Sequence, residues 1–198
     1  MSNTFTDTGR YAPAGLEFDR ERGTWAMWLF ISTEAALFVM LFFTYFYLSF
    51  QNSDWPPGEA PPYRLALLML LVLLSSSGVL HFGELMRRQE HETRARLAVV
   101  ATLLLGAVFM GLQVYEFREH LSGLTPASNA YGSIFYTITS IHGAHVVTGM
   151  AMLGYVLALP DLSSIAMPRP LHNVAIYWHF VDAVWVVIVA LLYLWPHL

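Results

Sequence analysis

Five apolar segments constrain the fold of this chain more than any other feature. Each is close to, or longer than, the roughly 20 residues with which a helix crosses the hydrocarbon core of a bilayer. The segments cover residues 25–50, 64–86, 96–117, 132–159 and 174–196. Backbone groups in lipid must bond within their own segment, and the alternating pattern of a membrane barrel is missing. The sequence therefore predicts an all-α integral membrane bundle of five transmembrane helices.

Composition supports this class. Of the 198 residues, 56% are hydrophobic and only 12% are charged, which is more apolar surface than one soluble core of this size would bury. The formal charge of −4 is small and argues against nucleic acid as a partner. The chain has no Cys, which excludes disulfides, thiolate metal sites and thiol nucleophiles.

The connections and the Arg residues predict domain organisation and topology. Residues 1–24 are polar, mixed in charge and unlike a signal peptide, so we expect a cytoplasmic N-terminal segment there and one membrane domain over residues 25–198. Eight of the ten Arg residues lie in that segment and in the connections between spans two and three and between spans four and five. This bias predicts a cytoplasmic N-terminus and a C-terminus on the opposite side.

Polar side chains inside the spans need an explanation because they are costly in lipid. They recur in pairs at i, i+3 spacing, which places both members on one helix face. The pairs are His81 and Glu84, Gln113 and Glu116, His142 and His145, and His179 and Asp182. We interpret these residues as interhelical hydrogen bonds that hold the bundle together. In the last pair, we expect the imidazole and the carboxyl to satisfy one another.

Glu34 differs from these pairs because no basic residue lies near it in the sequence. Counted from Trp25 at 1.5 Å per residue, it lies about 13 Å inside its span. Burial favours the neutral form of a carboxyl, so we expect Glu34 to be protonated at neutral pH. Two roles stay open for it, namely a structural hydrogen bond or the handling of protons or lipid.

The histidines do not match the common cofactor patterns. A bis-His haem needs imidazoles on different helices at similar depth, which only His81 and His179 offer. Di-iron bundles use Glu-x-x-His pairs, whereas the order here is His-x-x-Glu, His-x-x-His and His-x-x-Asp. We therefore expect no metal ligand, cofactor or catalytic residue in this chain, with a self-contained membrane haem or metal protein as the alternative. A transporter is disfavoured because no broken helices occur in corresponding halves.

Four stretches resemble subunit III of the haem-copper respiratory oxidases. They occur in this order: MWLFISTEAALFVMLFF (27–43), GLQVYEF (111–117), YGSIFYTITSIHGAHVVTG (131–149) and YWHFVDAVW (177–185). The last two stretches are the most specific, and the resemblance covers nearly the whole chain from Trp25 onward. Long members of that family have seven spans, and this chain resembles their last five, as in short bacterial cytochrome c and quinol oxidase subunits.

The resemblance implies a subunit without a catalytic centre of its own in a proton-translocating oxidase of the aerobic respiratory chain. It implies direct packing on subunit I, which holds the haems and copper, with subunit II and other oxidase subunits nearby. It also implies a bacterial inner (plasma) membrane location and bound structural phospholipid. The subunit would stabilise subunit I and support proton uptake. The accessory subunit of nitric oxide reductase, from the same superfamily, is the alternative.

The resemblance also implies roles for individual residues. Glu34 corresponds to the family's membrane-buried carboxyl, which reacts with carbodiimides, a reaction that needs a protonated acid. The paired polar residues match the family's polar positions and are expected to bond helices together. Arg169 and His172, in the connection before the last span, are expected to meet lipid headgroups.

Overall fold

A computed structural model describes residues 14–57, 61–120, 124–160 and 170–197. Within these ranges every regular element is a helix, and five helices are long and apolar enough to cross a membrane. They are α1 (Ala14–Gln51), α2 (Tyr63–Arg88), α3 (Glu92–His120), α4 (Ala130–Ala158) and α5 (Pro170–Ile188). A π-helical segment (Val189–Leu194) and a 3-10 turn (Trp195–His197) continue α5. The prediction of an all-α bundle of five membrane-spanning helices is confirmed.

Local sequence signals set several helix ends. The side chain of Asn129 accepts a hydrogen bond from the amide of Gly132 at 2.7 Å and so caps the start of α4. Glu90, in the tight turn between α2 and α3, has a φ of 62°, the left-handed conformation that commonly follows a helix end. By contrast, α1 begins at Ala14, well before the predicted span. Apolar patterning marks the membrane-spanning part of a helix, not its full length.

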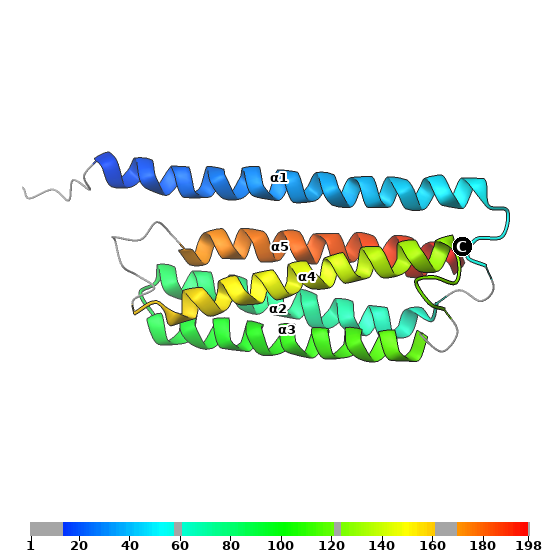
Figure 1. Cartoon of the computed structure of the whole chain (residues 1–198). Coiled ribbons are helices and arrows are strands. Elements are labelled where there is room, and N and C mark those ends of the chain that lie inside the picture. The colour runs from blue at the N-terminus through cyan, green and yellow to red at the C-terminus, as the bar shows by residue number, and fades with distance from the viewer. Residues whose placement is uncertain (1–13, 58–60, 121–123, 161–169, 198) are drawn as a thin grey trace, which may run out of the picture.

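The helices are arranged with α4 and α5 in the middle, α1 on one side and the α2–α3 hairpin on the other (Figure 1). In the most apolar 18-residue window of each span, 56% of the residues are buried in the last span, but only 11% are buried in α1. The start of α1, the turn between α2 and α3, the end of α4 and the start of α5 all lie at one end of the bundle (Figure 1). The last helix is therefore the core against which the others pack.

Small residues let the last helix approach its neighbours closely. Trp178 is fully buried, and a Cβ added at Gly149 or Gly106 would lie 2.9 or 3.0 Å from its ring. The ring nitrogen of Trp178 donates to Ser76 Oγ at 2.9 Å. One side chain thus fixes α5 against α2, α3 and α4, the use of glycine that is typical of helix contacts in membranes.

Arg96 closes the end of α4 from the neighbouring helix α3. Its guanidinium donates to the carbonyls of Leu157, Leu159 and Pro160 at 3.0, 2.8 and 2.9 Å. These are carbonyl groups that a helix end leaves without helical partners, and a cation there also complements the helix dipole. Arg96 therefore ties the α2–α3 hairpin to the core of the bundle.

Candidate functional site: polar clusters between the helices

Apart from His81 and Glu84, the predicted polar residues fall into three clusters, each at a contact between helices. We name each after one member: the Glu34 cluster joins α1, α4 and α5, the Ser77 cluster joins α2 and α5, and the His142 cluster joins α3, α4 and α5. Polar bonds are therefore spread across the interfaces of the bundle.

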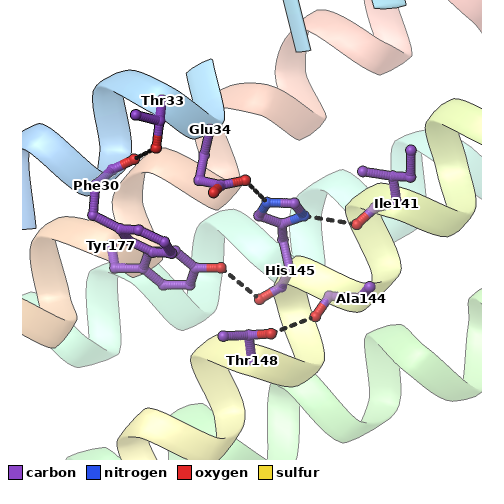
Figure 2. Close-up of polar contacts among 8 residues, drawn as sticks. All are labelled: Phe30, Thr33, Glu34, Ile141, Ala144, His145, Thr148 and Tyr177. Atoms are coloured by element: carbon purple, nitrogen blue, oxygen red, sulfur yellow. Dashed lines mark hydrogen bonds and ion pairs between the residues drawn. The ribbon is translucent and has the colours of Figure 1, made fainter. Parts of the chain in front are cut away.

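In the Glu34 cluster, the carboxyl meets an imidazole from another helix (Figure 2). His145 Nε2 lies 2.9 Å from Glu34 Oε2, and His145 Nδ1 lies 2.8 Å from the carbonyl oxygen of Ile141. The side chains of Glu34 and His145 are only 22% and 13% exposed. The carboxyl that had no basic neighbour in the sequence thus has one in space, contributed by α4.

The contact with Ile141 restricts where protons can sit in this pair. A carbonyl oxygen only accepts hydrogen bonds, so His145 Nδ1 must carry a proton. Nε2 then either accepts a hydrogen bond from protonated Glu34 or, in the imidazolium form, donates one to the carboxylate. In both forms one proton lies between the two side chains, and it can move from one to the other without any change in their positions.

Aromatic side chains enclose the pair. Tyr177 donates its hydroxyl to the carbonyl of His145 at 3.3 Å, and its ring stacks on Phe30 with a centroid distance of 5.9 Å. The ring of Phe38 packs edge-on against His145 at 5.0 Å. Tyr177 and Phe30 are seen beside the pair in Figure 2. Tyr177 was not among the residues predicted from the sequence to bond helices together.

In the Ser77 cluster, a serine on α2 joins two residues of α5. Ser77 Oγ lies 2.6 Å from His179 Nδ1 and donates to Asp182 Oδ2. The expectation that His179 and Asp182 bond one another directly is corrected, because both point at α2 and a hydroxyl can donate and accept at once. Ser77 was not among the predicted polar residues, because an uncharged hydroxyl in the small-residue run SSSG (75–78) gives no strong sequence signal.

The Ser77 cluster contains the three residue types of a hydrolytic triad, but the hydrogen bonds connect them in a different order. In a triad the carboxylate orients the imidazole, which in turn accepts the serine proton. Here the carboxylate of Asp182 accepts from Ser77 itself. Through the serine hydroxyl, this arrangement bonds α2 to α5.

About one and two turns beyond Ser77 along α2 lie His81 and Glu84. His172 Nδ1 lies 2.8 Å from Glu84 Oε1, so the histidine for which contact with lipid headgroups was predicted pairs with a buried carboxyl. Arg169, the other residue in that expectation, lies outside the described residues. His81 is exposed, yet ligand atoms of His81, Glu84 and His179 all lie within 4.8 Å of one another.

The His142 cluster is the most buried of the three. Gln113 Nε2 donates to the carbonyl of Thr139 at 2.6 Å, and Glu116 is fully buried. His142 is also fully buried and stacks on Trp185, with ring centroids 4.9 Å apart. Both ring nitrogens of His142 lack a hydrogen-bond partner among the described residues. Although they share a face of α4, His142 and His145 thus belong to different contacts.

Comparison with known proteins identifies the family. A family model described as cytochrome c oxidase subunit III matches residues 17–197. The chain is 35% identical to cytochrome c oxidase subunit 3 of Bacillus subtilis (strain 168) over 173 residues, covering 84% of this chain and 83% of that protein. It is 34% identical to the probable quinol oxidase subunit 3 of Staphylococcus haemolyticus over 175 residues, covering 84% and 86%. This multi-pass membrane protein belongs to the cytochrome c oxidase subunit III family.

Proposed function

We propose that this chain is a non-catalytic subunit of a haem-copper terminal oxidase, which packs on the catalytic subunit I, stabilises it and supports proton uptake during oxygen reduction. The observation that carries this proposal is the family match over residues 17–197. The relatives include proteins named as subunits of cytochrome c oxidases and of quinol oxidases. In this proposal, subunit I holds the haems and copper, and subunit II and further chains complete the complex.

The Glu34 cluster is the part of the chain best suited to proton handling. A carboxyl and an imidazole share one proton there, 2.9 Å apart, where α1 meets the α4–α5 core. We assign Glu34 to the storage or transfer of that proton, or to an adjoining lipid. In this proposal, the His142 cluster and the Ser77 cluster hold the helices together.

The proposed location is the bacterial plasma membrane, with the Arg-rich end in the cytoplasm. This end comprises the start of α1, the turn between α2 and α3, the end of α4 and the start of α5. Support comes from the excess of Arg in these segments and from the bacterial relatives. The C-terminus would then lie outside the cell, at the other end of the bundle.

Purification of an affinity-tagged chain in mild detergent, with identification of the accompanying proteins, tests the proposal. We expect an oxygen-reducing subunit with haem and copper to co-purify in stoichiometric amount. Co-purification of a nitric oxide reductase with non-haem iron would instead support the alternative within the superfamily. Recovery of the chain without any redox partner would overturn both.

A further inference from the structure

Two histidines and one glutamate from two helices converge near the Arg-rich end of the bundle. His81 and Glu84 lie one turn apart on α2, and His179 faces them from α5. Their ligand atoms all lie within 4.8 Å of one another. We propose that His81, Glu84 and His179 bind one divalent transition-metal ion, with Zn²⁺ as the best-fitting ion.

The distances suit such an ion after small side-chain rotations. Zinc binds imidazole nitrogen and carboxylate oxygen at roughly 2.0–2.2 Å, so ligands in a tetrahedral site lie about 3.4 Å from one another. Each ligand atom therefore needs to move by roughly 1 Å. Two histidines and a glutamate form a well-known zinc ligand set, which leaves a fourth position for water.

Two further side chains already hold these ligands in place. Ser77 Oγ lies 2.6 Å from His179 Nδ1, and His172 Nδ1 lies 2.8 Å from Glu84 Oε1. The imidazole can then present its other nitrogen to an ion, and the carboxyl its other oxygen. Hydrogen bonds of this kind orient metal ligands and are typically needed for full affinity.

Burial and access also favour an ion here. Glu84 is only 8% exposed within a membrane span, and a nearby cation would compensate the cost of burying its charge. The residue lies one helical turn before the end of α2 at Arg88, roughly 6 Å along the helix axis. His81 is exposed, so the other helices of this chain do not enclose the site on that side. A bound ion would tie α2 to α5.

This inference revises the expectation that the chain binds no metal. That expectation depended on the order of residues in the di-iron motif, Glu-x-x-His, on single helices. A site assembled from two helices does not need that order, because its third ligand comes from a neighbour far away in the sequence.

Zinc titration of the purified complex tests the site. The complex is stripped with a chelator and titrated with Zn²⁺ against a competing chelator, and bound zinc is counted by elemental analysis. We expect one zinc ion per complex to bind at this site. Its zinc-edge X-ray absorption spectrum should show scattering from imidazole. His81→Ala should weaken this binding by at least about tenfold, since removal of even an outer partner costs 10–100-fold.

The control is His91→Ala, which changes an exposed histidine in the turn between α2 and α3 and should leave zinc affinity unchanged. Because His81 is exposed, its replacement should preserve packing. Glu84→Gln, which keeps the shape of the side chain, provides a second variant with the same expected loss. Equal zinc binding by the unaltered complex and both variants, or a spectrum without imidazole scattering, would mean an adventitious ion only and would overturn the proposal.

Discussion

Replacement of Ser77 by Ala is predicted to destabilise the contact between α2 and α5. The hydroxyl bonds His179 and Asp182 together, and Asp182 is only 4% exposed. Removal of the Ser77 hydroxyl leaves a carboxyl oxygen and an imidazole nitrogen without their partner. Each buried polar group left without a partner costs about 1–3 kcal/mol. Because His179 is only partly buried, we expect a total loss of about 2–4 kcal/mol. The better helix propensity of Ala offsets this by a few tenths of a kcal/mol at most.

The matched control is Ser75→Ala. Ser75 lies two residues earlier on the same helix, is exposed, and donates only to the carbonyl of Leu71 in its own helix, at 2.7 Å. Both variants lose one hydroxyl from α2, so their difference isolates the interhelical bonds. The assay is reversible unfolding of the full chain in mixed detergent micelles, with zinc removed by a chelator. If both variants lost the same free energy of unfolding, the role given to Ser77 would be refuted.

Two further predictions follow from the other contacts. Gly149→Ala should cost about 1–3 kcal/mol of stability by overpacking against Trp178. The control Gly154→Ala should be tolerated, because a Cβ there meets nothing within 4 Å. Thermal unfolding in detergent compares the stability of the two variants. Asp182→Leu should reduce the amount of assembled complex, as seen on native gels, without changing the haem spectrum of the complex that remains, so selective loss of haem would contradict it.

The helices themselves could be predicted from the sequence because the bilayer imposes their length and apolar character. Five long apolar segments separated by Pro, Gly and charged turns leave few other folds. The start of α1 was the largest difference, since polar residues outside the membrane extend a helix without leaving a hydropathy signal.

The polar clusters were only partly predictable. Periodicity indicates which face of a helix a residue occupies, but not which helix lies opposite that face. Glu34 and His145, 111 residues apart in the sequence, could each be singled out, but not paired. Ser77 carried no charge to attract notice, and its importance depends on the register between α2 and α5, which close packing of small residues determines.

The most direct test of the central claim is the optical spectrum of this chain after separation from its complex, together with a haem assay. A subunit that braces a redox enzyme without a redox centre of its own should show no Soret band and no stoichiometric haem, while the remaining complex keeps its haem spectrum. One haem per chain, lost when His81 or His179 is replaced, would contradict the claim.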